Sequence, residues 1–244
     1  MIHIWVRATL DYDDERSFEA QLRPGFREQV ALWDALFEMP YRVFRARVRA
    51  IARDNLQRVD GAACSAWEDI PAGARVLPVD DDDWFRPDVA AVLRRELVPG
   101  VAAVRWPSSF LEIPINRRHE LGAWRARIHR PRPLYACTSN NYALFASEES
   151  KPLLQRHVQA SRWAETQAPG RVRLVDERLS VMNRTLASQT SLGHLGRSIG
   201  RRRLLRRLVR YRRLYDRSLP GALGWAQPHV DRMGQLMDEL RLRR

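Results

Sequence analysis

The spacing of apolar positions divides the chain into segments with strand periodicity and segments with helix periodicity. Residues 2–9 alternate apolar and polar side chains, as a half-buried β-strand does. Val30, Trp33 and Phe37 recur at helical spacing and predict a helix over 25–38. Further strands are predicted over 74–79, 103–106, 109–115, 124–129, 134–146 and 172–176. Further helices are predicted over 41–58, over 89–97 after Pro87 and Asp88, and over 151–166 with Ser150 as the cap.

The order of these elements predicts an α/β fold. Strands alternate with helices in the first half of the chain, which favours a mixed, mainly parallel sheet flanked by helices. After Gly200 the chain is predicted to be wholly helical, with Gly221 and Pro228 separating two segments. We therefore expect a catalytic domain over 1–196 and a helical C-terminal extension over 197–244. In a sheet of this kind, ligands bind beyond the carboxyl ends of the strands.

Length and composition restrict the class of protein. The 244 residues, 45% of them hydrophobic, suffice for one domain with a helical appendage. No apolar run is long enough to span a membrane, and the N-terminal segment becomes acidic too early for a secretory signal. We expect a cytoplasmic protein that binds peripherally at the inner face of the membrane. Cys64 and Cys137 lack metal-ligand spacing and are interpreted as buried or incidental thiols.

Positive charge is concentrated near the C-terminus. Residues 197–217 carry ten arginines and one aspartate, so most of the net charge of +13 lies there and binding of the whole protein to nucleic acid is not favoured. Over 201–217, leucines and tyrosines at helical spacing predict a basic amphipathic helix. Such a helix suits an anionic membrane surface. The alternatives are that its apolar stripe packs on the catalytic domain, or that it binds nucleic acid.

Four successive aspartates, Asp80, Asp81, Asp82 and Asp83, follow the predicted strand 74–79. Side chains alternate at the end of a strand, so we expect Asp80 and Asp82 to project to one side and Asp81 and Asp83 to the other. Crowded carboxylates repel one another unless a cation or water compensates their charge. Mg²⁺ or Mn²⁺ binds carboxylate and phosphate oxygens, and a diphosphate leaving group needs such a cation. The alternative interpretation is a solvated acidic turn.

The segment VLPVDDDDWFRPDV resembles the DxD segment of GT-A glycosyltransferases. It is more similar still to a bacterial putative rhamnosyltransferase-like group, in which a segment with paired asparagines and a further segment follow the DxD. Here these correspond to SNNYALF at 139–145 and LSVMNRTLASQ at 179–189. The resemblance covers about residues 70–195 and implies a nucleotide-sugar donor.

The resemblance also implies roles for individual residues. Asp80, together with Asp81, would bind the nucleoside or ribose of the donor. Asp82 would ligate the metal that bridges the diphosphate, and Asp83 would support the sugar or the metal. Asn140 and Asn141 would position a sugar hydroxyl, or else satisfy a turn.

An inverting transferase also needs a carboxylate that removes the proton of the acceptor hydroxyl. Asp176 and Glu177, which follow the predicted strand 172–176, have a suitable position, and Glu148-Glu149 are the alternative pair. Acidic residues near helix starts are also common for capping reasons alone.

Two histidines are candidates for a metal or phosphate ligand. His194 lies in the glycine-flanked loop SLGHLG and is the predicted additional ligand. His157 lies on a predicted helix, where a structural role is favoured.

Together these features predict a metal-dependent glycosyltransferase that uses Mg²⁺ or Mn²⁺ and acts on a glycan or lipid-linked acceptor. Two alternatives remain. A metal-dependent phosphoryl-transfer enzyme or nuclease would also use clustered carboxylates. A non-enzymatic module that binds membrane or nucleic acid would leave the acidic run solvated.

Overall fold

The computed structural model describes residues 1–7, 10–64, 66–107, 109–112, 125–128, 140–184, 221–241 and 243. The contacts divide the chain into two compact units, one formed by 1–8, 54–110 and 127–182 and the other by 9–53, 111–126 and 183–244. This grouping differs from the predicted division into 1–196 and 197–244. The predicted division assigns the catalytic site to residues 1–196, and this assignment stays a prediction.

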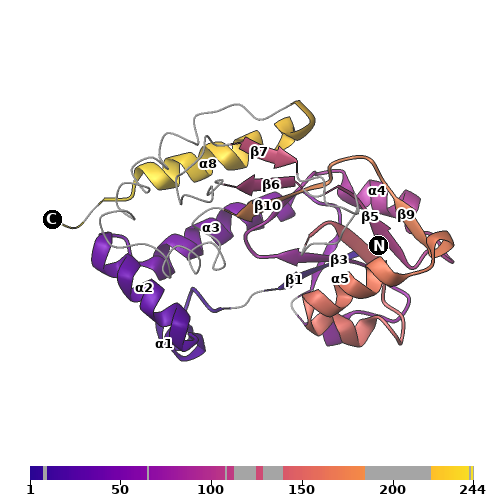
Figure 1. The fold of residues 1–244 in the computed structure, drawn as a ribbon, viewed down its shortest axis with the longest axis horizontal. Coiled ribbons are helices and arrows are strands. Elements are labelled where there is room, and N and C mark those ends of the chain that lie inside the picture. The colour runs from indigo at the N-terminus through magenta and orange to yellow at the C-terminus, as the bar shows by residue number, and fades with distance from the viewer. Residues whose placement is uncertain are drawn as a thin grey trace. The chain divides into compact units, whose positions relative to one another are not determined.

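Within the first unit, the described strands form a six-stranded sheet in the order β2-β1-β3-β8-β5-β9 (Figure 1). The strands are β1 (Ile2–Arg7), β2 (Ala62–Cys64), β3 (Arg75–Asp80), β5 (Ala103–Arg105), β8 (Tyr142–Phe145) and β9 (Val172–Leu174). The accompanying helices are α4 (Val89–Glu96) and α5 (His157–Thr166), with 3-10 turns η1 (Trp67–Asp69), η2 (Lys151–Gln155) and η3 (Pro169–Arg171). All neighbouring strands are parallel except where β8 runs against β3 and β5. The predicted mixed, mainly parallel sheet is confirmed.

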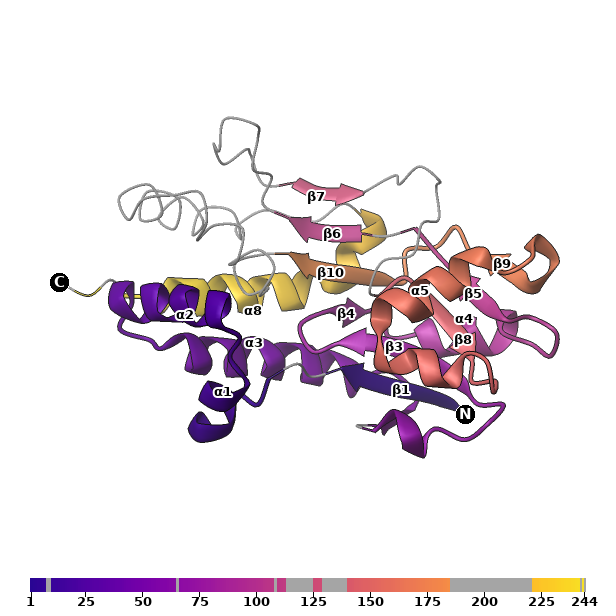
Figure 2. The same cartoon turned by 60° about the horizontal axis from the view of Figure 1, so that its bottom comes forward.

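A hydrophobic core covers each face of this sheet, because successive side chains of a strand point to opposite faces. Leu77 and Val79 of β3 belong to the core that includes α4, whereas Val76 belongs to the core that includes α5. In β1, Ile4 faces the first of these cores and Trp5 the second. The helices α4 and α5 therefore lie against opposite faces (Figure 2).

Short strands form a second sheet beside the acidic segment. Among the described residues its order is β4-β10-β6-β7, with bounds β4 (Trp84–Phe85), β10 (Ser180–Arg184), β6 (Ser109–Glu112) and β7 (Arg125–Ile128). β4 and β10 are antiparallel, with Ser180 opposite Phe85 and Val181 opposite Trp84. The strands β2, β4 and β10, of three, two and five residues, were not predicted.

The predicted helix over 151–166 is wrong in its first half. Residues 151–155 form the 3-10 turn η2, and Arg156 is extended, with φ −127° and ψ 98°, before α5 begins. Ser150 does not cap the helix, because its hydroxyl donates to the backbone oxygen of Phe145 at 2.6 Å. Leu154 is fully buried, so the packing of this turn prevails over continuous helix formation.

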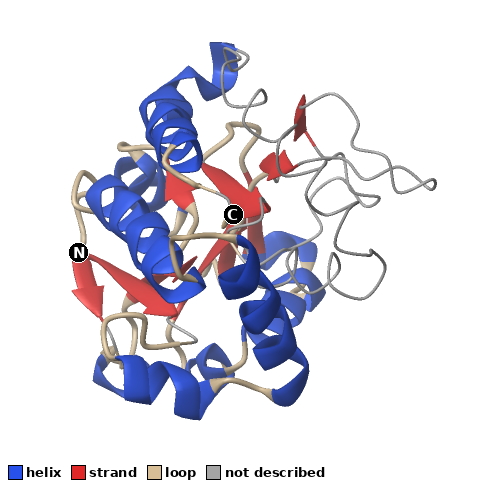
Figure 3. Ribbon diagram, turned by 90° about the vertical axis from the view of Figure 1, so that its left-hand side faces the viewer, coloured by secondary structure: helices blue, strands red, loops and turns tan. Residues whose placement is uncertain are grey.

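The described part of the second unit consists mainly of helices (Figure 3). They are α1 (Glu15–Gln21), α2 (Pro24–Leu36), residues 41–53 of α3 (Tyr41–Leu56), the 3-10 turn η4 (Gly221–Ala226) and α8 (Gln227–Asp238). Its core contains Trp33, whose ring centroid lies 4.5 Å from that of Phe37 and 4.8 Å from that of Phe44. The short helix α1 was not predicted.

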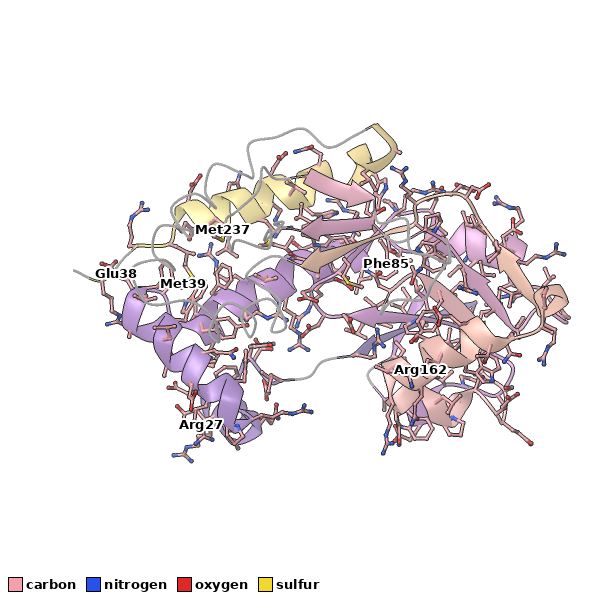
Figure 4. All side chains as sticks on the ribbon, viewed as in Figure 1. Arg27, Glu38, Met39, Phe85, Arg162 and Met237 are labelled. Carbon is pink, nitrogen blue, oxygen red and sulfur yellow. The ribbon has the colours of Figure 1, made fainter. Side chains whose placement is uncertain are left out.

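The end of the chain pairs with the corner between α2 and α3 in this unit. The N–H of Glu38 donates to the oxygen of Arg241, and the N–H of Arg243 donates to the oxygen of Leu36, both at 2.9 Å. Figure 4 labels Glu38 and Met39 at this corner and Met237 on α8. The predicted basic helix over 201–217 lies outside the described residues. No helix in the described part of the chain is long and apolar enough to cross a membrane.

Candidate active site

Side chains from several strands meet at one edge of the six-stranded sheet, where its parallel strands end. β1 ends at Arg7 and β3 ends at Asp80, and these two residues are register partners. β5 ends at Arg105 on the same edge. Because β8 runs in the opposite direction, Asn140 and Asn141, which precede it, also lie at this edge. Ligands of α/β sheets bind beyond the carboxyl ends of the strands, so this edge is the candidate site.

The four aspartates form a tight turn instead of continuing the strand. β3 ends at Asp80, and the N–H of Asp83 donates to the backbone oxygen of Asp80 at 3.2 Å. The predicted alternation of Asp80 and Asp82 against Asp81 and Asp83 is therefore wrong, because alternation requires an extended chain. Asp81, Asp82 and Asp83 are buried, and Asp83 is only 1% exposed. A fully solvated acidic turn does not fit this burial.

An arginine from the neighbouring strand balances part of the negative charge. The guanidinium of Arg7 lies 2.9 Å from the carboxylate of Asp80, and the two side chains are 9% and 31% exposed. The same guanidinium lies over the ring of Trp5, 5.7 Å from its centroid. Arg7 was not identified from the sequence, because no local sequence pattern indicates that β1 and β3 are paired in the sheet or in which register.

Buried polar side chains connect Asp83 to two other segments of the first unit. The amide nitrogen of Asn140 donates to Asp83 Oδ2 at 2.9 Å, and the hydroxyl of Ser180 donates to Asn140 Oδ1 at 3.5 Å. The indole of Trp106 donates to the oxygen of Ser180 at 2.8 Å. Asn141 donates to the backbone oxygen of Trp106 at 2.8 Å and accepts from its N–H at 3.1 Å. Asn140 and Asn141 were predicted to position a sugar hydroxyl. Both are fully buried, and both form hydrogen bonds within the protein.

The strand after the acidic turn is held by an asparagine that sequence reasoning missed. Asn55, in the last turn of α3, donates to the oxygen of Phe85 at 2.9 Å and accepts from its N–H at 2.7 Å. The side chain of Asn55 thus replaces a strand partner for Phe85, which Figure 4 labels on β4. Directly after β4, the backbone N–H of Arg86 donates to the backbone oxygen of Leu179 at 2.9 Å. These bonds fix the exit from the acidic turn.

The alternative pair of bases, Glu148 and Glu149, lies at the opposite edge of the sheet. They follow β8, whose last residue Phe145 pairs with Arg75 at the beginning of β3. The six residues of β3 separate this end from Asp80, a length of about 17 Å at the usual rise of a strand. A base at Glu148 or Glu149 therefore cannot serve a site at the acidic turn.

The favoured pair, Asp176 and Glu177, lies at the same edge as the acidic turn. Both follow β9, which is parallel to β5 and three positions from β3 in the sheet, or about 14 Å at the usual strand spacing. After Glu177 the chain runs toward β4, where the backbone oxygen of Leu179 accepts a hydrogen bond from the N–H of Arg86. Asp176 is exposed to solvent.

Glu177 takes part in ion pairs along this crossing. Its Oε2 accepts a hydrogen bond from Arg86, and its Oε1 lies 3.4 Å from a nitrogen of Arg95. Burial opposes the charge of Arg86, but its hydrogen bonds with Asp88 and Glu177 outweigh this effect and raise its pKa. Both oxygens of Glu177 therefore interact with arginines. The catalytic role of Asp176 and Glu177 stays a prediction.

The donor atoms at the turn suit a hard divalent cation that is shared with a phosphate ligand. Within the described ranges, no three histidine, cysteine, aspartate or glutamate side chains are grouped so that they could hold a metal ion. Mg²⁺ commonly takes only one or two carboxylates and completes its shell with water and phosphate oxygens. Asp82 and Asp83 fit that pattern. The predicted ligand His194 lies outside the described residues.

Comparison with known proteins adds no relative from which a function could be transferred. No protein-family model matches the chain, and no curated protein matches its sequence significantly.

Proposed function

We propose that this protein is a metal-dependent glycosyltransferase of the GT-A type. It would transfer a sugar from a nucleotide-sugar donor to a glycan or lipid-linked acceptor. One observation carries the proposal: the three segments that resemble such enzymes are joined by hydrogen bonds between their side chains. Asn140 of the second segment bonds Asp83 of the first at 2.9 Å and Ser180 of the third at 3.5 Å. Asn140 thus links all three segments, which supports a common role for them.

The arrangement of the sheet supports the same function. A GT-A enzyme is expected to have a mixed, mainly parallel sheet with its acidic segment at the carboxyl end of a central strand. β3 is such a strand, with β1 parallel on one side and β8 antiparallel on the other. Pro78 lacks an N–H for the sheet, and the pairing with β8 stops earlier, at Val76. Within the described residues, the last four residues of β3 therefore have no register partner in β8.

The residues of the edge have separate tasks in the proposed reaction. Asp82 and Asp83 would hold a divalent cation, which neutralises the donor diphosphate as its bond to the sugar breaks. Asp80 and Asp81 would contact the nucleoside and ribose, with Arg7 limiting the charge at Asp80. If the reaction inverts configuration, Asp176 or Glu177 would remove the proton from the acceptor hydroxyl.

Binding of nucleotides with and without metal tests this proposal. The melting temperature is measured with UDP, GDP, ADP, CDP and dTDP, each with and without Mn²⁺. One nucleotide is expected to stabilise the protein when Mn²⁺ is present, because a ligand that binds only the folded state raises its stability. Asp82→Ala is expected to abolish this shift, and Asp69→Ala, which removes an exposed carboxylate outside the turn, is the control.

The same measurement also tests the shared cation. Since the turn supplies few ligands, Mn²⁺ alone and the nucleotide alone should each stabilise the protein weakly, and their joint effect should exceed the sum of the two. A nucleotide shift that persists in Asp82→Ala would contradict the proposal. So would the lack of any shift across the panel.

A further inference from the structure

Arg86 bonds the segment between β9 and β10 at two points. Its backbone N–H donates to the oxygen of Leu179 at 2.9 Å, and its guanidinium donates to Oε2 of Glu177. At its other end the segment is tied to the six-stranded sheet, where the N–H of Val175 donates to the oxygen of Arg105 at 2.9 Å. Both ends of the segment and one side chain near its middle are therefore held in place.

The position of Arg86 is itself fixed with respect to the acidic turn. Arg86 lies three residues after Asp83 and directly after β4. The last residue of β4, Phe85, bonds the side chain of Asn55 through both its N–H and its oxygen. A second carboxylate, that of Asp88, accepts a hydrogen bond from Nε of the same guanidinium, whereas Nη2 serves the segment after β9. Arg86 thus joins the exit from the acidic turn to that segment.

We propose that Arg86 is a positioning residue for the transfer step, which holds residues 176–178 so that the candidate base, Asp176 or Glu177, keeps a constant place relative to the acidic turn. This inference rests on the proposed function, in which that segment supplies the base. In the step, the carboxylate takes the proton of the acceptor hydroxyl while the acceptor oxygen bonds to the anomeric carbon of the sugar. The bond from that carbon to the diphosphate breaks, and its electron pair leaves with the nucleoside diphosphate. Misplacement of a reacting group by about 1 Å lowers the rate of such a step strongly.

A second arginine, on helix α4, approaches the same carboxylate. A nitrogen of Arg95 lies 3.4 Å from Oε1 of Glu177, whose side chain is 41% exposed. The side chain of Arg86 is more enclosed, with 22% of its surface exposed. Ion pairs that reach the surface contribute little to global stability. We therefore expect Arg86 to act locally, on the opening of this segment.

Two substitutions at position 86 and one control test the proposal. Arg86→Met removes the charge and keeps the apolar stem of the side chain. Arg86→Lys keeps a charge but offers a single nitrogen in place of the planar guanidinium. Arg94→Met is the matched control, because Arg94 also lies on or near the start of α4 and pairs with Asp60, which does not belong to the segment.

Hydrogen exchange under native conditions measures how often the segment opens. The reporters are the amide at position 86, which bonds Leu179, and the amide of Val175, which bonds Arg105. Arg86→Met should speed the exchange of both about fivefold, as for the loss of one partly exposed ion pair. The amide of Phe145, which bonds the oxygen of Ala102 in the same sheet, should exchange as in the wild type.

The kinetic measurement is the release of nucleoside diphosphate from UDP-glucose, GDP-mannose, ADP-glucose, CDP-glucose and dTDP-rhamnose with Mn²⁺, where water is the acceptor. Arg86→Met is expected to lower kcat about tenfold and to leave the KM of the donor unchanged, because the acidic turn binds the donor and the segment only places the base. Arg86→Lys should recover part of the loss. Arg94→Met should behave like the wild type in both measurements.

Each other result decides against a specific claim. Faster exchange with an unchanged kcat would leave Arg86 a structural residue only, and a raised KM with an unchanged kcat would assign it to donor binding. Either result overturns the positioning role and leaves the transferase standing, as do equal effects of Arg86→Met and Arg94→Met. If the wild type releases nucleoside diphosphate from none of the donors, the proposed function and the positioning role fail together.

Discussion

Arg7 and Asp80 end neighbouring parallel strands at the same register, and their side chains form an ion pair with a distance of 2.9 Å. The first strand of the chain thereby becomes part of the acidic site. Four carboxylates in consecutive positions repel one another. The ion pair with Arg7 offsets the negative charge of Asp80 and so reduces this repulsion. The remaining three, at positions 81–83, are buried and need other compensation.

Arg7→Ala should destabilise the folded protein, and a divalent cation should restore part of the loss. The substitution leaves Asp80 without its cation beside three further carboxylates, which we expect to cost about 1–3 kcal/mol, since the pair is partly exposed. Mn²⁺ should stabilise the variant more than the wild type. Urea unfolding with and without Mn²⁺ measures both effects.

Arg94→Ala is the matched control for this experiment. Arg94 and Asp60 are also 2.9 Å apart, but their side chains are 39% and 82% exposed. Such a surface pair contributes about 0–1 kcal/mol. Equal losses in the two variants, or a loss in Arg7→Ala that Mn²⁺ leaves unchanged, would show that Arg7 does not balance the acidic turn.

Asn55→Ala should be strongly destabilising for a residue outside the hydrophobic core. It leaves both the N–H and the oxygen of Phe85 without the partners that Asn55 provides. Two buried backbone groups left unsatisfied cost about 2–5 kcal/mol together. Asn55→Asp keeps an acceptor for the N–H, but at neutral pH it places a carboxylate in a fully buried site against the oxygen of Phe85, so its loss should be at least as large. Chemical unfolding checks both variants, and an alanine variant as stable as the wild type would contradict the prediction.

Asp34 should make the stability of the helical unit fall as pH rises through the mildly acidic range. Partial burial raises its pKa above the ordinary value of 3.8 and outweighs the hydrogen bond from the N–H of Tyr41 and the charge of Arg243. The folded state therefore binds this proton more tightly than the unfolded state. The stabilisation is complete below pH 3.8 and is lost as pH rises through the folded pKa.

Asp34→Asn tests this, because it keeps an oxygen for Tyr41 and removes the titration. Relative to the wild type, the variant should gain melting temperature as pH rises through that window. Asp11→Asn is a control of opposite sign. Hydrogen bonds from the N–H groups of Asp14 and Asp13 lower the pKa of Asp11, so its contribution is lost as pH falls. Parallel pH profiles for wild type and Asp34→Asn would refute the assignment.

The basic segment 201–217 should bind anionic membranes through its arginines. Replacement of Arg206, Arg207 and Arg210 by glutamine in the full chain should weaken binding on the order of a hundredfold, at about 1 kcal/mol per charge. Substitution is preferable to truncation at 196, because truncation would remove the buried core residues of α8. Flotation with vesicles of phosphatidylcholine, with and without phosphatidylserine, measures this. Equal flotation of wild type and variant would contradict membrane binding and favour packing on the protein.

Local sequence patterns were sufficient to predict the elements whose apolar positions by themselves indicate a buried face. β1, β3, α2 and α4 were predicted close to their observed bounds, because each is long enough for its apolar positions to show a period. The acidic cluster was also evident, since its position after an apolar run is a property of consecutive residues. The prediction that a mainly parallel sheet carries it at a carboxyl end followed from the alternation of strands and helices.

Only the tertiary structure decided how the site is assembled, because its contacts join residues that are far apart in the chain. Asn140 and Asp83 are 57 positions apart, and Trp106 and Ser180 are 74 positions apart. No periodic pattern within one segment indicates a contact between residues so far apart in the chain. The turn at 80–83 replaced the expected alternation for the same reason, since bonds from Asn55 and Leu179 hold the following strand β4 in place. The sequence by itself determined where the carboxylates stand in the chain, whereas long-range hydrogen bonding decided which side chains surround them.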